Sequence, residues 1–284
     1  MPAKITEMIN NHRYPEILYK FPQAVKLYHF INNAATLRNW YVKNTLKKLL
    51  INLPYPFHIY DTGCGSGDIL LPCAGKYKTS FFTGIDRIQE NIKLCKSFAD
   101  KSLLTNCNFS TGNIETYIPE RPVDLITCIT VLQYCKNETE VLKCFYKSLN
   151  PNGILLLYVP VNYKRIFRWF DTLRSVKGKT VDYDSTMGIY HHFTDLEIKD
   201  KVKAAGFSIS ESITTYKTCG KISFELYSSF LTIVKILPFF TGFLLFPIFL
   251  IIYPLILILM FLDLFQRNND GNGLLLIAKK PDIT

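Results

Sequence analysis

The sequence predicts an α/β domain with a parallel β-sheet between helices, and with an apolar helical insertion before the last strand. Between residues 57 and 207, short apolar runs alternate with segments whose apolar residues recur at helical spacing. Such repeated β-α units form a parallel sheet that helices cover. Residues 236–262 are a run of 27 residues without one charge, and a short apolar strand follows them. That run predicts the insertion.

Seven segments are predicted strands. Several of the first five are apolar without alternation, as in strands that are covered on both faces. Phe207–Tyr216 (FSISESITTY) predicts a sixth strand, and Gly273–Lys280 (GLLLIAKK) a seventh. The first five predicted strands are residues 57–61, 80–86, 106–110, 123–130 and 153–160.

Helices are predicted between these strands and before them. Apolar residues recur at helical spacing over 87–102 and 137–150. Thr194 and Glu197 have capping-box spacing and predict the start of another helix. Pro72 falls inside the helix predicted after the first strand and is expected to kink it. The predicted organisation is a helical cap over 1–50, a sheet domain over 51–217 and 271–284, and the insertion over 218–270.

The positive charge is concentrated in two segments. The chain has a formal net charge of +10. Residues 1–50 carry a surplus of six basic residues, and residues 161–180 carry a surplus of five. A local basic patch favours an anionic partner such as lipid headgroups. Nucleic acid is the other partner that such a patch allows, but the aromatic residues of the second segment (YKRIFRWFDTLR) fit a membrane interface better.

Cysteine usage predicts a reducing compartment. The eight cysteines are scattered singly, without a CxxC pair. No Cys/His spacing of a zinc site is present, so we expect no metal. The first residues, MPAKITEMINNHRYPE, lack the apolar core of a signal peptide. We expect the protein to lie on the cytoplasmic face of a membrane.

The stretch IYDTGCGSGDIL carries the strongest functional signal. Asp61 ends a predicted strand, and three glycines follow at alternate positions before a helix. Glycine is needed where the backbone turns sharply and approaches a ligand closely. The helix N-terminus beyond offers unpaired N–H groups and a positive dipole end. Asp68 stands where the last glycine of a GxGxxG dinucleotide motif would be, which disfavours a nicotinamide reductase.

This Asp-x-Gly-x-Gly-x-Gly pattern resembles the first motif of the class I S-adenosylmethionine-dependent methyltransferases. The resemblance extends over roughly residues 40–217 and 273–280. It implies a Rossmann-like sheet of seven strands, parallel except for an antiparallel last strand, and S-adenosylmethionine as the cofactor. Asp86 stands where the family's acidic residue accepts hydrogen bonds from the ribose hydroxyls. Asn113 stands where the family usually has an Asp facing the adenine amino group, and its amide carbonyl still offers an acceptor.

Two later segments also match the family. VDLITCITVLQY is similar to the fourth-strand motif, whose end lines the methionine side of the cofactor, and LNPNGILLLYVP to the turn into the fifth strand. The cofactor-binding residues that the resemblance implies are Asp61, Gly63, Cys64, Gly65, Gly67, Asp86, Arg87, Asn113, Ile114, Ile129 and Thr130.

Methyl transfer requires an acceptor atom in line with the S–CH3 bond, about 3 Å away in a water-poor pocket. A hydroxyl acceptor also benefits from a base whose pKa lies near neutrality. Tyr190, His191 and His192 in GIYHHF are the candidates, because loops of this region border the acceptor pocket in the family. The alternative is that one histidine is a surface residue and the other contacts the entry of the next helix. His12, His29 and His58 are expected to be structural.

The apolar insertion is long enough to cross a bilayer once. Its 27 residues would extend about 40 Å as a helix, against ~30 Å of hydrocarbon. In the methyltransferase fold the last two strands pair antiparallel, so the number of crossings must be even or zero. Two crossings would place Lys235 well inside the first crossing, and a lysine at mid-bilayer costs roughly 2.5–3.5 kcal/mol. Pro238, Pro247 and Pro254 are expected to interrupt any pair of straight helices.

We therefore expect a hairpin that dips into one leaflet, with an amphipathic first helix and an almost wholly apolar second helix. The basic stretch 163–179 would lie beside it. A two-pass hairpin is the close alternative, and burial of the apolar surface in a dimer interface is another.

The function expected is methylation of a lipophilic or amphipathic acceptor at a membrane surface with anionic lipids, most simply at oxygen. The alternatives are C-methylation of a quinone-type ring and a non-catalytic membrane adaptor that keeps the fold. Nucleic acid is not expected as a partner.

Overall fold

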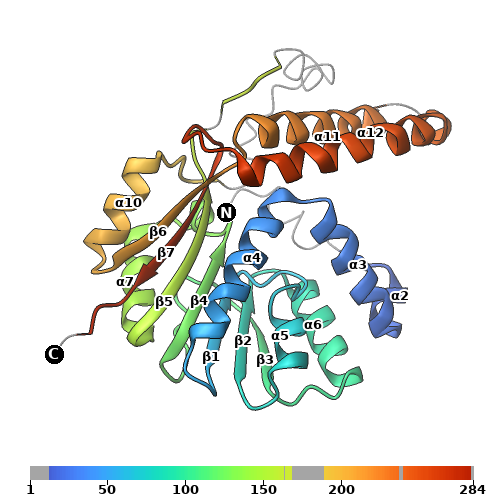
Figure 1. Ribbon diagram of the computed structural model, residues 1–284. Helices are drawn as coiled ribbons and strands as arrows, with labels where there is room; N and C mark the ends of the chain where they lie inside the picture. The colour runs from blue at the N-terminus through green and yellow to red at the C-terminus, as the bar shows by residue number, and fades with distance from the viewer. Residues whose placement is uncertain (1–12, 163, 168–188, 237–238, 283–284) are drawn as a thin grey trace.

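The computed structural model describes residues 13–162, 164–167, 189–236 and 239–282. Its centre is a seven-stranded sheet in the order β3-β2-β1-β4-β5-β7-β6 (Figure 1). The first five strands are parallel, and β7 runs antiparallel to both β5 and β6. The predicted fold class is thereby confirmed. The strands are β1 (His58–Thr62), β2 (Phe81–Asp86), β3 (Cys107–Thr111), β4 (Val123–Ile129), β5 (Leu149–Pro160), β6 (Ser208–Thr215) and β7 (Gly273–Lys279).

Helices cover both faces of the sheet. α4, α5 and α6 lie on one face, and α7 and α10 lie on the other (Figure 1). α2 and α3 precede α4, and α11 and α12 come between β6 and β7. The helices are α2 (Glu16–Lys20), α3 (Pro22–Ala34), α4 (Leu37–Asn52), α5 (Leu70–Lys76), α6 (Gln89–Lys101), α7 (Glu138–Ser148), α10 (Asp195–Ala204), α11 (Thr218–Ile236) and α12 (Phe239–Phe265), with the 3-10 turn η1 (Leu132–Tyr134).

β5 shows why the strands are apolar without alternation. Leu156 and Tyr158 join the core beneath α4, α5 and α6, whereas Leu155 and Leu157 join the core beneath α7 and α10. Successive side chains of a strand point to opposite faces, so a strand between two helical layers is apolar at every position.

Local signals place several helix ends. Thr194 caps α10, and its hydroxyl accepts a hydrogen bond from the Glu197 backbone N–H at 3.2 Å, as the capping-box spacing predicts. Pro72, which was expected inside a helix, lies in the first turn of α5, because α5 begins at Leu70. A backbone N–H in the first turn has no partner within the helix, so proline costs little there.

α11 and α12 form an antiparallel pair that extends from the sheet domain (Figure 1). Pro247 and Pro254 were expected to interrupt the second helix, but α12 continues through both. Proline removes one backbone hydrogen bond and bends a helix without always ending it. Among the described residues, no helix has both the length and the apolarity that a bilayer crossing needs.

Candidate active site

The glycine-rich loop follows β1 and is tied to the neighbouring strand. The backbone N–H groups of Gly63 and Cys64 both donate to the carbonyl of Ile85, at 2.7 and 2.9 Å. Gly63 has a φ of +71°, and a Cβ there would collide with a methyl carbon of Val131. A Cβ on Gly65, whose φ is +54°, would meet nothing within 4 Å. The loop therefore requires glycine at 63, and its backbone at 65 is open to a ligand.

Asp86 supports this loop from the end of β2. One carboxylate oxygen accepts a hydrogen bond from the Gly65 N–H, and the other accepts one from the Ile88 N–H, both at 2.8 Å. Asp86 is buried. Each carboxylate oxygen has a further lone pair, so the same side chain can hold the loop and accept from a ligand hydroxyl.

Two cavities meet at the glycine loop. The first, of about 250 Å³, lies between the loop and the N-terminal helices. The second, of about 310 Å³, lies along the ends of β2, β3 and β4. Both are lined by Gly63, Ile129 and Thr130. Together they form an extended site with the loop at its middle, as a ligand with a nucleoside end and an amino-acid end requires.

Most of the cofactor-binding residues predicted from the sequence line these cavities. Asp61, Gly63, Cys64, Gly65, Ile129 and Thr130 line the first cavity. Gly63, Asp86, Arg87, Asn113, Ile114, Ile129 and Thr130 line the second.

Gly67 lines neither cavity. A Cβ there would lie 2.8 Å from Leu71 and 2.9 Å from the Cys95 sulfur, so this glycine allows the loop to pack closely on α5 and α6. Asn113 is at the second cavity, but its amide is engaged with Glu115. The amide oxygen accepts from the Glu115 N–H, and the amide nitrogen donates to its carboxylate, both at 3.1 Å.

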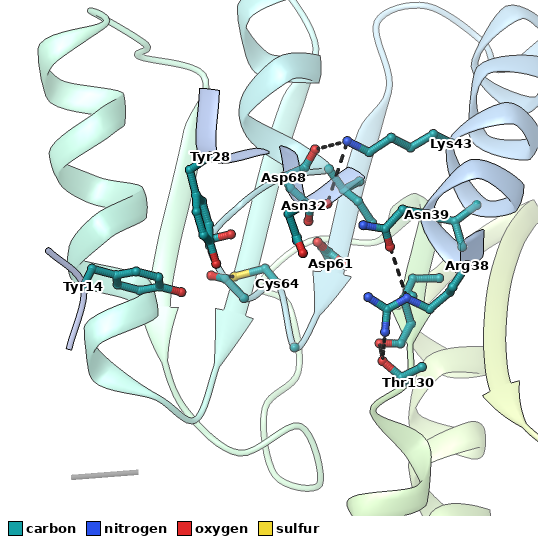
Figure 2. A pocket seen from close by; sticks show the side chains of 16 residues that line it. Tyr14, Tyr28, Asn32, Arg38, Asn39, Lys43, Asp61, Cys64, Asp68 and Thr130 are labelled. Atoms are coloured by element: carbon teal, nitrogen blue, oxygen red, sulfur yellow. Dashed lines mark hydrogen bonds and ion pairs between the residues drawn. The ribbon is translucent and has the colours of Figure 1, made fainter. Parts of the chain in front are cut away.

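The N-terminal helices contribute residues that sequence reasoning missed. Arg38, at the start of α4, lines the first cavity (Figure 2). Its guanidinium donates to the Thr130 hydroxyl at 3.0 Å and to the Asn39 side-chain oxygen at 3.1 Å. A guanidinium fixed in this way matches a carboxylate, such as that of the cofactor's methionine end. Neither motif nor periodicity distinguishes Arg38 from an arginine on any helix surface.

Further residues that were not predicted from the sequence make the first cavity polar. Lys43 donates to the Asp68 carbonyl at 3.1 Å and lies 3.8 Å from its carboxylate (Figure 2). Burial lowers the pKa of Lys43. Tyr14 and Tyr28 also line the cavity, and burial raises the pKa of Tyr28, which keeps its hydroxyl neutral.

Asp61 is the buried acid of the first cavity. It is 2% exposed, and the Thr127 hydroxyl donates to its carboxylate at 2.6 Å. Burial raises the pKa of Asp61 to about 7. A nearby positive charge favours the ionised form of this carboxyl. Asp61 can therefore pair with the ammonium or the sulfonium of the cofactor.

The predicted catalytic residues Tyr190, His191 and His192 line neither cavity. A ring nitrogen of His191 lies 2.7 Å from the Glu138 carboxylate, and the His191 ring stacks on Phe193. These contacts attach the segment to α7, on the face of the sheet opposite the N-terminal helices. The catalytic role of the three residues stays a prediction.

Comparison with known proteins agrees with this geometry. A family model described as "Methyltransferase domain" matches residues 57–204. A trans-aconitate 2-methyltransferase from Streptomyces avermitilis is 28% identical over 109 residues, which cover 38% of this chain and 40% of that protein. A ubiquinone biosynthesis O-methyltransferase from Rickettsia akari is 28% identical over 151 residues, which cover 50% and 59%.

The chain thus spans 40–59% of the length of these two curated relatives. Among solved structures, a coclaurine N-methyltransferase bound to N-methylheliamine and SAH superposes with a TM-score of 0.56 at 17% identity. That superposition covers 86% of this chain and 72% of the other. At this identity it supports the fold.

Proposed function

The chain belongs to the methyltransferase domain family, and from this premise we propose that it methylates an oxygen of a lipophilic or amphipathic acceptor at a membrane surface. S-adenosylmethionine is the cofactor, and it supplies a methyl group activated by a positively charged sulfur. The observation that carries the proposal is the joined pair of cavities at the glycine loop, with an exposed apolar helix in the same molecule.

The contacts of the loop divide the donor site into two ends. Asp86 would hold the ribose and Asn113 the adenine in the second cavity. Arg38 would hold the methionine carboxylate in the first cavity, where Asp61 faces the positive charge. Because the N-terminal helices cover this end, they exclude water from the reacting atoms.

α12 supports the membrane part of the proposal. Ile251, Leu255 and Ile258 are 78%, 51% and 55% exposed, and they fall on one face of the helix. The opposite face carries Ile256 and Met260, which are buried in the core of the sheet domain. A helix with one face packed and the other apolar and exposed suits insertion in the plane of one leaflet. We place the enzyme at the cytoplasmic face of the membrane.

The base of the hairpin lies close to the first cavity. Tyr216, just before α11, accepts a hydrogen bond from the Arg38 backbone N–H at 3.2 Å. An acceptor that enters along the hairpin would therefore arrive beside the methionine end of the cofactor.

The basic stretch 163–179 lies largely outside the described residues. Its described part, 164–167, lies beside α11, because the backbone N–H groups of Ile166 and Phe167 both donate to the buried Glu225 carboxylate at 2.8 Å. This contact supports the proposed position of the basic stretch next to the hairpin, where it would meet anionic headgroups.

We retain His191 and His192 as proposed bases for the acceptor. Replacing both by Ala is expected to lower kcat by about tenfold or more, with a smaller change in cofactor Kd. Steady-state kinetics together with calorimetric titration of the cofactor separate these effects. Unchanged turnover would leave His191 with the structural role that its pairing with Glu138 provides.

A small carboxylic acid is a second candidate acceptor. The first cavity is polar and contains the cationic Arg38 and Lys43, and one relative is named for trans-aconitate. Such an acid would bind there without any contribution from α12.

Incubation with methyl-labelled S-adenosylmethionine and a cell extract tests the proposal. We expect the label in the lipid fraction, and expect it to decrease strongly with an Asp86→Ala variant. Label found only in the aqueous acid fraction would replace the lipophilic acceptor with a carboxylic acid.

A further inference from the structure

A groove of about 680 Å³ lies between α3, α5 and α6, away from the donor site. Within the described part of the chain, it shares no lining residue with the two cavities at the glycine loop. Its apolar lining comes from Phe30 of α3, Leu71 and Pro72 of α5, and Phe98 and Leu104 of the α6 region. A concave apolar surface of this volume lies within the range of small-molecule sites.

The polar part of the lining carries positive charge. Lys26, Lys76 and Lys78 line the groove, and among the residues that the structure describes no acidic residue does. None of the three lysines forms an ion pair with an acid among the described residues. Three ammonium groups beside an apolar floor complement an anionic head on an apolar body.

The apolar surface continues from the groove onto α3. Leu27, Phe30 and Ile31 are 59%, 70% and 57% exposed. An extended chain longer than the groove would remain in contact with this face, whereas a compact ring system would not reach it. The shape of the apolar surface therefore favours an aliphatic chain, and the lysines favour an anionic head.

We propose that this groove binds an aliphatic chain with an anionic phosphate or carboxylate head. The chain lies on Phe30, Leu71 and Phe98, and the head meets the lysines. The ligand is either a free amphiphile or a lipid drawn from a bilayer, and it occupies a site distinct from that of the methyl donor.

Gly75 offers a variant that blocks the groove. It lines the groove in the last turn of α5, and a Cβ there would meet nothing within 4 Å. A Gly75→Phe side chain would therefore project into open space, and replacing glycine in a helix raises helix propensity. We expect this variant to fold and to bind S-adenosylmethionine as the wild type does. Gly75→Ala is the matched control, since its methyl group leaves most of the groove open.

The binding test uses dodecyl phosphate below its micellar concentration, measured by isothermal titration calorimetry. We expect saturable binding at one site, at least tenfold weaker for Gly75→Phe and unchanged for Gly75→Ala. Dodecyltrimethylammonium and inorganic phosphate serve as the reversed-charge and head-only ligands, and we expect neither to bind.

A second pair of variants tests whether binding requires the lysines of the groove. Lys26→Ala with Lys76→Ala is expected to weaken dodecyl phosphate binding at least fivefold, and Lys47→Ala with Lys48→Ala, on the exposed face of α4, to leave it unchanged. Equal binding of the cationic amphiphile, or binding of dodecyl phosphate that Gly75→Phe does not weaken, would overturn the proposal.

Vesicles of phosphatidylglycerol distinguish the two sources of ligand. Weaker vesicle binding by Gly75→Phe than by Gly75→Ala assigns the groove to a bilayer lipid. Equal vesicle binding, with dodecyl phosphate binding lost, assigns it to a free amphiphile.

Discussion

At the residue scale, Asp61 predicts how cofactor affinity depends on pH. Burial raises the pKa of its carboxyl from 3.8 to about 7, so in the free protein it is largely neutral below pH 7. A cationic cofactor favours the carboxylate, so binding below pH 7 requires loss of a proton. Affinity should therefore rise by up to about tenfold for each pH unit toward 7 and level off above it. Calorimetric titration from pH 5.5 to 8.5 measures this.

Asp61→Asn supplies the control, because an amide has no proton to lose and its profile should be flat. The same pKa shift has a consequence for stability. The neutral carboxyl favours the folded state fully below about pH 4, and this contribution is lost as pH rises through about 7. A wild-type affinity independent of pH would remove Asp61 from the charged end of the site.

Asp86→Ala should weaken cofactor binding and also destabilise the loop. The carboxylate is the proposed ribose acceptor, and loss of charge-assisted hydrogen bonds is expected to raise Kd by about tenfold or more. The substitution also leaves the N–H groups of Gly65 and Ile88 without their acceptor. We expect a loss of about 1–3 kcal/mol in the free energy of unfolding, measured by urea denaturation. Asp100→Ala, at an exposed position of α6, should change neither quantity, and normal binding by Asp86→Ala would contradict the ribose assignment.

At the scale of elements, a buried polar cluster joins the hairpin to the N-terminal helices. The Asp263 carboxylate in α12 accepts hydrogen bonds from the Tyr41 hydroxyl of α4 at 2.9 Å and from the Gly220 N–H of α11 at 2.8 Å. Lys217 donates to the carbonyl of Gln266 at the end of α12 at 2.6 Å. Asp263 is fully buried, and burial raises its pKa. The cluster therefore fixes the direction in which the hairpin leaves the domain.

Removal of partners from this cluster should lower stability unequally. Tyr41→Phe removes a hydroxyl that donates to the carboxylate and the backbone carbonyl of Asp263, and it is expected to cost about 1 kcal/mol. Asp263→Ala leaves the buried Gly220 N–H without its acceptor and the Tyr41 hydroxyl with the backbone carbonyl alone, and it should cost about 2–4 kcal/mol. Urea denaturation of both variants checks the order. Equal losses would show that the Tyr41 hydroxyl, and not the carboxylate, carries the contact.

At the scale of the whole molecule, the exposed face of α12 predicts membrane attachment. Ile251→Glu, Leu255→Glu and Ile258→Glu together should reduce binding to anionic vesicles by tenfold or more, because they place charge where apolar side chains would enter the leaflet. The fold should persist, because all three positions are exposed. Vesicle co-sedimentation is the measurement.

The matched control is Leu103→Glu, Ile118→Glu and Leu196→Glu, which changes three exposed apolar residues outside the hairpin. This control should sediment with vesicles as the wild type does. As a coarser test, residues 223–268 can be replaced by a short linker, and continued sedimentation of that deletion would also count against the hairpin.

The strand and helix pattern, the sheet class and the glycine loop could all be predicted from the sequence. Each depends on a local signal, such as an apolar run, a capping spacing or a turn that only glycine allows. The main difference in the sheet is the start of β5, where the strand begins at Leu149 instead of the predicted 153. Leu149 pairs with Val123 across a register shift, and such irregular pairing has no signature within one strand.

The side chains that complete the donor site, and the place where the hairpin is attached, depend on contacts between residues far apart in the chain. Arg38 and Thr130 are 92 residues apart, and Tyr41 and Asp263 are 222 apart. The packing of the chain also pairs His191 with Glu138, and it places Gly67 against α5 and α6 instead of in the lining of the site. Local patterns encode the conformation of neighbouring residues. Contacts between distant residues arise only when the helices pack on the sheet.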